Sequence, residues 1–408
     1  MKVKRIEKHI ITKNNQNYKA IDYLCLMSKN LYNYTNYVTR QSFLHTGKFL
    51  NDSELIKKFR ARHNFDYYNM CGNTNQLCVQ QLFNDWKSFF KAIKAYKNDK
   101  SKFLSKPKMP AYKNKNGRNL VVFTYNDARI KGEYLYVNKK ANILPIKTKI
   151  KNSQLKQVRL VPQTNCYVVE VVYETTTDDL CLNKDNYLSI DLGIDNFATC
   201  YDSHANKTFI INGKTIKSIN QYFNKKRSLL MSYVGDKGTS NKLKNLIFKR
   251  NNKINNYLHN SSKFIINYCI QNDIGTIIIG HNKNWKQNSN LGKVNNQKFA
   301  SIPFNTFIQQ LQYKSENVGI TCIITEESYT SKVDHSVKET MCHHEVYSGK
   351  RIKRGLFRMS NSKVINADLN GAIGILRKVV DESYFDKIIN RGFVINPVKV
   401  NPLTKTSM

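Results

Sequence analysis

Hydrophobic positions change their spacing along the chain, and each change predicts a different kind of secondary structure. Residues 1–12 have the pattern of a short strand. Apolar residues then recur every three or four positions, which predicts helices with one apolar face. One predicted helix carries Leu24, Met27, Leu31, Tyr34 and Val38, and a second, over 74–97, carries Cys78, Leu82, Trp86, Phe89 and Ile93.

The helical pattern stops at a basic connector, SKPKMPAYKNKNGR, which spans residues 105–118. Its two prolines and its glycine disfavour a helix. Short β-like runs separated by turns follow, and they predict a small barrel or sheet. The runs read NLVVFTY, GEYLYV, LKQVRLV and CYVVEVVY, and residues 180–186 are the expected seam before the next domain.

Beyond the seam, the pattern gives three strands and then long basic helices. Two further apolar runs, TIIIG and GITCIIT, predict buried strands with a helix between them. This order predicts an α+β multidomain chain in which helices cover a mixed sheet. The expected bounds are 214–271 for the long helices, 276–280 and 319–325 for the two runs and 302–316 for the helix between them. The segment 362–380 is expected to enter the final helix. From about residue 385 the chain is expected to be loose.

Charge is the strongest compositional signal. Lys and Arg number 66 against 29 Asp and Glu, which gives a formal net charge of +37. Self-repulsion of this size destabilises a compact chain unless a polyanion neutralises it, so nucleic acid is the leading partner. No apolar run reaches the roughly 18 residues of a membrane span and no amphipathic anchor is evident, so we expect no membrane partner.

Nine cysteines are scattered without a Cys-x-x-Cys pair, and the N-terminus lacks the apolar stretch of a signal peptide. We therefore expect reduced thiols in a cytoplasmic protein. The segment Cys342-His343-His344-Glu345 resembles a metal cluster. A structural zinc site needs about four ligands, usually as two spaced pairs, so an ordinary surface segment is the better interpretation.

Acidic residues stand at three places where apolar strands end or a core helix begins: Asp191, the pair Glu326-Glu327, and Asp368. Strand ends and helix starts of an open α/β sheet are where a site collects. Carboxylates brought together repel one another unless a hard cation such as Mg²⁺ lies between them. Two such ions about 3.5–4 Å apart can activate water and stabilise the leaving oxygen of a phosphodiester. Each acid alone has a structural interpretation, a turn for Asp191 and an N-cap for Asp368.

Several motifs resemble TnpB, the family of transposon-encoded RNA-guided nucleases related to miniature type V CRISPR effectors. They are IDLGIDNFAT, GHNKNWKQ, ESYTSK, SGKRIKRGLF and INADLNGAIGILRK, with SKNLYNYTNYVTRQSF, WKSFFKAIKAY and PKMPAYKNKNGRN in the N-terminal half. The resemblance covers about 20–380. It implies a split RuvC domain with an RNase H-like sheet, preceded by a wedge β-barrel that a helical recognition domain interrupts. The implied bounds are 1–12 and 110–185 for the wedge barrel, 13–109 for the recognition domain, 186–327 and 363–384 for RuvC, 328–362 for a nucleic-acid-binding insert and 385–408 for a loose tail.

The resemblance makes Asp191 the first and Asp368 the last catalytic, metal-binding carboxylate. Many TnpB proteins carry the middle Glu directly after the strand equivalent to TIIIG, but here GHNKNWKQ follows and offers only His281, a poor Mg²⁺ ligand. The implied strand order puts GITCIIT beside TIIIG, about 4.8 Å away. We therefore assign the middle role to Glu327, with Glu326 as the alternate, and expect two Mg²⁺ ions.

Two more departures from the family concern the insert and the last helix. Family members place two Cys-x-x-Cys pairs in the insert, whereas this chain has only Cys342, so no zinc is expected. Gly374 stands where the family often has Asn. The expected nucleic-acid contacts are Gln76, Gln80, Tyr112, Lys113 and Arg118, which we assign to duplex DNA, and Tyr329, Thr330, Ser331, Lys332, Lys350, Arg351, Lys353 and Arg354 of the insert.

The resemblance implies an RNA-guided DNA endonuclease, with one protein for each guide RNA from the transposon end. It also implies a bacterial protein that associates with the nucleoid when it binds DNA. Its target would be double-stranded DNA beside a short recognition motif, cut by Mg²⁺-dependent hydrolysis at a single RuvC site. The alternative is an RNA-guided DNA-binding repressor that no longer cuts. Such a protein should lose at least one carboxylate, so Asp191 and Asp368 favour the nuclease. A transposase with its own nucleophile is the weakest hypothesis, because no Tyr or Ser constellation is evident.

Overall fold

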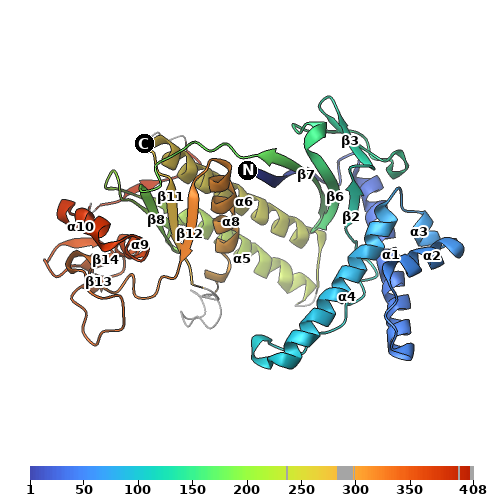
Figure 1. Cartoon of the computed structure of the whole chain (residues 1–408), viewed down its shortest axis with the longest axis horizontal. Helices are drawn as coiled ribbons and strands as arrows, with labels where there is room; N and C mark the ends of the chain where they lie inside the picture. Colours follow the sequence, from blue (N-terminus) through green and yellow to red (C-terminus); the bar gives the residue numbers. More distant parts are fainter. Residues whose placement is uncertain (236–237, 283–296, 298, 394–395, 405–408) are drawn as a thin grey trace. The chain divides into compact units, whose positions relative to one another are not determined.

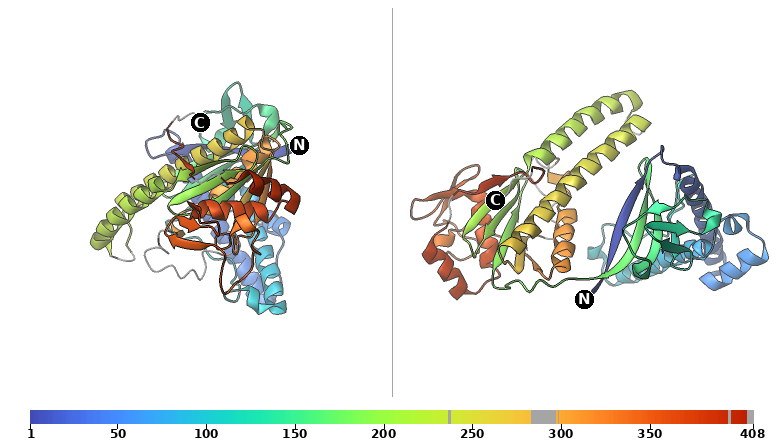
Figure 2. Two further views of the ribbon diagram at one scale, coloured as in Figure 1. Left: turned by 90° about the vertical axis from the view of Figure 1, so that its left-hand side faces the viewer. Right: turned by 90° about the horizontal axis from the view of Figure 1, so that it is seen from above.

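The computed structural model describes residues 1–235, 238–282, 297, 299–393 and 396–404. The chain divides into two compact units, Met1–Thr176 and Thr177–Met408. Figures 1 and 2 show the elements of each unit. No helix within these residues combines the length and the apolar character that crossing a bilayer requires.

In the first unit, four helices stand between the first strand and the basic connector (Figure 1). The stripe predicted for the first helix packs inward, with Leu24, Met27 and Leu31 buried. Trp86 is fully buried and donates its indole N–H to Asn36 at 3.1 Å, which joins the two long helices. The helices are α1 (Tyr18–Thr46), α2 (Asp52–Ala61), α3 (Phe65–Tyr68) and α4 (Thr74–Asn98).

Two antiparallel sheets complete the first unit. The larger has the order β1-β7-β6-β2, so the N-terminal strand pairs with the last strand of the unit along its whole length. The smaller, β3-β4-β5, includes two short strands that the sequence pattern did not predict. The strands are β1 (Lys2–Ile11), β2 (Val121–Thr124), β3 (Ala128–Lys131), β4 (Tyr134–Val137), β5 (Ile146–Lys147), β6 (Leu155–Gln163) and β7 (Cys166–Thr176).

The second unit is built on a six-stranded mixed sheet with the order β12-β11-β8-β9-β10-β16. Strand β9 runs antiparallel to its neighbours β8 and β10, whereas β11 runs parallel to β8 and β12 parallel to β11. The expected neighbourhood of TIIIG and GITCIIT is therefore present. The strands are β8 (Tyr187–Leu192), β9 (Asn196–Asp202), β10 (Lys207–Asn212), β11 (Thr276–Gly280), β12 (Thr321–Thr325) and β16 (Val398–Val400).

Helices pack their apolar sides on this sheet. One core cluster joins α6 and α8 to the sheet through side chains such as Phe197, Ile265 and Phe307. A second cluster joins α9 and α10 to Tyr201 and Ile278 of the sheet. A small antiparallel sheet, β13-β14-β15, precedes α9. The bounds are α5 (Lys214–Val234), α6 (Asn241–Gln271), α8 (Phe304–Asn317), α9 (Ala367–Arg377), α10 (Glu382–Arg391), β13 (Lys350–Lys353), β14 (Leu356–Arg358) and β15 (Val364–Asn366).

The structure corrects three expectations. Strand β12 is not buried: it is the edge of its sheet, and Ile324 is 42% exposed. The helix α9 is not the last, because α10 follows it. The tail is not loose over its described part, because β16 pairs with β10 and buries Val400. Most of the GHNKNWKQ motif, from residue 283 onward, lies outside the described residues.

Candidate active site

Asp191 lies inside strand β8, where it is paired opposite Thr199 of β9, so it does not close a turn. Its side chain faces helix α9: a Cβ added at Gly371 would stand 2.9 Å from Asp191 Oδ2. Glycine therefore lets the helix approach the carboxylate. Burial, followed by the nearby charges of Asp368 and Glu327, raises the pKa of Asp191 well above its ordinary value.

Glu327 is the second residue past the end of β12 and points toward the end of β11. A Cβ added at Gly280 would stand 3.1 Å from Glu327 Oε2. The Glu327 backbone N–H donates to Asn282 Oδ1 at 3.0 Å, which orients the residue after the strand ends. Burial and the neighbouring Glu326 raise the pKa of Glu327 to about 7, while Lys378 opposes the shift.

Glu326 has a different environment although it is the next residue. It is exposed and forms an ion pair with Lys378, the C-cap residue of α9. This hydrogen bond to Lys378 is the largest cause of a lowered pKa at Glu326. Between the two candidates, Glu327 is the one whose charge acts on Asp191.

Asp368 lies in the first turn of α9, where the helix dipole favours a carboxylate. Asn366 is the N-cap, accepting from the N–H groups of Asp368 and Leu369, so the capping interpretation of Asp368 is wrong. The Asp368 carboxylate instead accepts from Asn196 Nδ2 at 2.7 Å and lies 3.8 Å from the guanidinium of Arg351.

The three carboxylates thus come from three separate parts of the sequence to one region, and the charges of Glu327 and Asp368 both act on the half-buried Asp191. Among the described residues, no three His, Cys, Asp or Glu side chains are close enough to hold a single ion. The donor set nevertheless suits Mg²⁺, which prefers carboxylate oxygens and retains several waters. Asp191, under the charge of both other acids, is the residue that could serve two ions.

Two arginines of the insert lie beside this region. Arg351 of β13 contacts Asp368, and its charge partly opposes the raised pKa of Asp191. Arg354 forms an ion pair with Asp195, which also pairs with Lys217 of α5. These contacts connect the insert to the strand ends that carry the carboxylates.

The remaining insert candidates divide into exposed and packed residues. Ser331, Lys332, Lys350 and Lys353 are exposed, and the Lys332 ammonium lies 5.9 Å from the ring centroid of Tyr329. Thr330 is buried and donates its hydroxyl to the Glu327 backbone carbonyl at 2.8 Å. Thr330 therefore supports the backbone that carries Glu327.

His335 is a buried residue that the sequence analysis did not single out. Its Nε2 is 2.8 Å from the Thr330 carbonyl, and burial lowers its pKa to about 4. A Cβ at Gly374 would stand only 2.6 Å from this ring nitrogen. Glycine at 374, where the family often has Asn, makes room for the imidazole. Sequence reasoning also missed Asn196 and Asn282, which hold the carboxylate residues and whose positions directly beside strands were the available signal.

In the first unit, the connector candidates lie along helix α1. Asn33 makes two hydrogen bonds to the backbone of Lys113, at 2.8 and 2.9 Å, and the Arg40 guanidinium lies 5.0 Å from the ring centroid of Tyr112. Tyr112 remains 44% exposed. On α4, Gln80 is exposed and Gln76 is half-buried.

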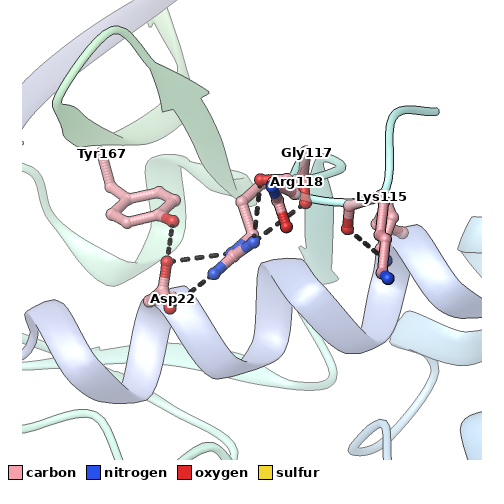
Figure 3. A network of polar contacts seen from close by, with 7 residues as sticks. Asp22, Lys115, Gly117, Arg118 and Tyr167 are labelled. Carbon is pink, nitrogen blue, oxygen red and sulfur yellow. Dashed lines mark hydrogen bonds and ion pairs between the residues drawn. The ribbon is translucent and has the colours of Figure 1, made fainter. Parts of the chain in front are cut away.

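Arg118 is engaged within the protein (Figure 3). Two of its nitrogens donate to the two oxygens of Asp22, each at 2.9 Å, and the Tyr167 hydroxyl also donates to Asp22. A third nitrogen donates to the Gly117 carbonyl at 3.0 Å. A direct base contact by Arg118 would require this ion pair to open, so the residue is placed to hold the connector on α1.

Comparison with known proteins supports the expected relationship. Residues 167–286 match the family described as "Probable transposase" (OrfB_IS605), and residues 304–375 match the "Cas12f1-like, TNB domain". The structure of a Cas12f1 in complex with sgRNA and target DNA shares the fold at a TM-score of 0.51, with 15% identity over 87% of this chain and 81% of that one. These matches are consistent with the resemblance of its motifs to TnpB.

The structure of the RNA-guided endonuclease Cas_phi3 also aligns with this chain. The identity is 9% over 97% of this chain and 93% of that one, and the TM-score is 0.43. No curated protein matches the chain. The wedge and RuvC arrangement expected for the fold is consistent with the likeness to Cas12f1.

Proposed function

We propose that this TnpB-like chain is an RNA-guided endonuclease that cuts double-stranded DNA by Mg²⁺-dependent hydrolysis at one site. The observation that carries the proposal is the electrostatic environment of Asp191, a half-buried carboxylate whose neighbours are two further acids. Burying uncompensated negative charge is costly, and a divalent cation relieves that cost.

Asp191, Glu327 and Asp368 would hold Mg²⁺ in this proposal. When bound, the metal supplies an activated water and charge stabilisation for the leaving oxygen. Asn196 and Asn282 orient the outer two acids through their hydrogen bonds. Arg351 is near enough to Asp368 to contact a phosphate oxygen of a strand that enters the site.

The partners in this proposal are a guide RNA from the transposon end and a target duplex with an adjacent short motif. The net charge of +37 supports a large polyanionic partner. The Cas12f1 structure that shares the fold is a complex with sgRNA and target DNA. Guide pairing would read the target, while Gln76, Gln80 and the Tyr112 region of the connector would contact the short motif.

The test uses protein purified with its RNA, which is sequenced to design a matching duplex. We expect cleavage in Mg²⁺, and Glu327→Ala should lower the rate at least about 100-fold, since loss of even an outer-shell metal partner costs 10–100-fold. DNA binding should be retained. Glu326→Ala is the matched control and should cut at nearly the normal rate.

An intact matching duplex with binding retained by the wild type would instead support the guided DNA-binding protein without nuclease activity. Loss of cleavage in Glu326→Ala, with normal cleavage in Glu327→Ala, would move the middle carboxylate by one residue.

A further inference from the structure

Helices α5 and α6 form a hairpin that projects from the sheet of the second unit (Figure 2). Its outer half has little contact with the core: α5 buries only Ile216 and Asn220, both near its start. Large apolar side chains remain exposed along it, including Tyr222 at 59% and Tyr233 at 77%. A helix pair of this kind presents a surface that the second unit itself does not cover.

Every Lys, Arg, Asp or Glu position within the two helices is a Lys or an Arg. Helix α5 carries five Lys and Arg and α6 carries six, and neither helix contains Asp or Glu. Within the part of the chain that the structure describes, none of Lys242, Lys249 and Lys253 has a carboxylate within ion-pair distance. The repulsion among these charges destabilises the hairpin unless a polyanion lies against it.

A groove between the two helices combines this charge with apolar and aromatic surface. It encloses about 630 Å³, within the roughly 300–1,000 Å³ of small-molecule pockets. Ile219, Tyr222 and Phe223 of α5 line one side, and Leu246 of α6 faces them. Lys242, Lys249 and Lys253 follow α6 at seven- and four-residue steps, so they form one stripe beside the groove.

Arg250, one of the residues that line the groove, links the two helices through its side chain. Its guanidinium lies 5.6 Å from the ring centroid of Phe223 and donates to Asn220 Oδ1 at 2.9 Å and to the Ser301 carbonyl at 2.7 Å. These contacts hold α6 against α5, so the groove exists before a ligand arrives.

We propose that this groove binds unpaired nucleotides of the guide RNA, with a base stacked on Tyr222 and phosphates along the lysine stripe. Aromatic rings beside a basic track are the common design for single strands, because an unpaired base offers a face that a duplex keeps covered. RNA is the favoured strand because the charge must be neutralised in the resting protein, and the guide is the nucleic acid that stays bound. The assignment rests on the proposed function for the identity of that RNA, but it does not require cleavage.

The first test is ultraviolet cross-linking of the protein as it is purified with its RNA, followed by mass spectrometry of the peptides. We expect a nucleotide adduct on Tyr222. Adducts found only outside residues 218–253 would overturn the assignment. If no RNA copurifies, the proposed function fails instead, so the two failures are distinguishable.

The second test measures affinity by fluorescence anisotropy in EDTA, with a labelled uridine-rich single-stranded RNA, a DNA strand of the same sequence and an RNA duplex. Tyr222→Leu should weaken RNA binding about 5- to 150-fold, the range for one stacked base. Tyr233→Leu is the matched control, because this more exposed tyrosine of the same helix lies outside the groove.

Replacing Lys242, Lys249 and Lys253 together by Gln should reduce the slope of log affinity against log salt by about 2, since single strands give roughly 0.7 for each phosphate contact. The matched control replaces Lys214, Lys244 and Lys263, which removes the same charge from the same helices outside the groove. Equal slopes for the two triple variants, tighter binding of DNA than of RNA, or an equal loss of single-strand and duplex binding in Tyr222→Leu would each refute the proposal.

Discussion

Replacing Glu327 by Gln should make the metal-free protein more stable at pH 8, although it removes a residue proposed for catalysis. The ordinary pKa of this carboxyl is 4.5, and burial with the charge of Glu326 raises it to about 7. Each unit of difference between the folded and unfolded pKa corresponds to about 1.4 kcal/mol. Ionised Glu327 therefore costs the folded state about 3 kcal/mol as an upper bound.

The sign of the pH dependence follows from the same shift. A carboxyl with a raised folded pKa favours the folded state when it is protonated, and this contribution is lost as the pH rises from about 4.5 through about 7. The advantage of Glu327→Gln should therefore be absent near pH 4.5, grow through pH 6 and be complete above about pH 7.5.

The assay is thermal unfolding in EDTA, followed at pH 5 and pH 8. A change of 1 kcal/mol shifts the Tm by about 2–4 °C for a domain of 150–250 residues, so the variant should gain up to about 6–12 °C at pH 8. Added Mg²⁺ should raise the wild-type Tm more than that of the variant, because the ion offsets the same repulsion.

Glu326→Gln is the matched control. The Glu326 carboxylate is stabilised by its hydrogen bond to Lys378, which lowers its pKa, so its removal should give no gain at pH 8. A Glu327→Gln protein that melts at or below the wild-type temperature at pH 8, or that gains equally at both pH values, would refute the electrostatic reasoning.

Three further predictions follow from packing, from the connector and from the metal. Gly374→Asn should lower the free energy of unfolding by about 1–3 kcal/mol, and with it the Tm, because the new Cβ meets His335. His335→Ala removes that clash, so the double variant should lose less stability than the sum of the losses in the two single variants. Arg118→Lys should cost about 1 kcal/mol by losing the paired hydrogen bonds to Asp22, and it should speed amide hydrogen exchange across 110–118; unchanged exchange there would contradict the positioning role. EDTA should stop DNA cleavage while leaving guided binding intact, and cleavage that persists in EDTA would exclude a required metal.

Periodicity predicted the elements that have strong local signals. The helix expected over 74–97 is α4, Thr74–Asn98, and the run TIIIG is the fully buried β11. The unpredicted strands β3 and β5 have four and two residues, which is too short for an alternating pattern to stand out. Strand β16 has three residues and depends on pairing with β10, nearly 190 positions earlier in the chain, so no local pattern reports it.

The candidate site was predictable only in part, for the same reason. The types and positions of Asp191 and Asp368 suggested carboxylates at strand and helix ends, and the resemblance to TnpB supplied their pairing with Glu327. Burial of GITCIIT was predicted wrongly because an apolar run does not distinguish a central strand from an edge. The ion pair between Asp22 and Arg118 joins residues 96 positions apart and leaves no mark in either local sequence.

The position of β12 at the edge of its sheet has a consequence for how the site can be lost. Within the described structure, this strand has a hydrogen-bonded neighbour on one side only, so it can detach at a lower free energy than the central strands. Glu327 is the second residue past its end, and detachment would withdraw one of the three acids while β8 and α9 stay folded. The fraction of molecules able to cut would then depend on how often β12 detaches. A molecule with β12 detached would keep the rest of its fold but would be temporarily unable to cut.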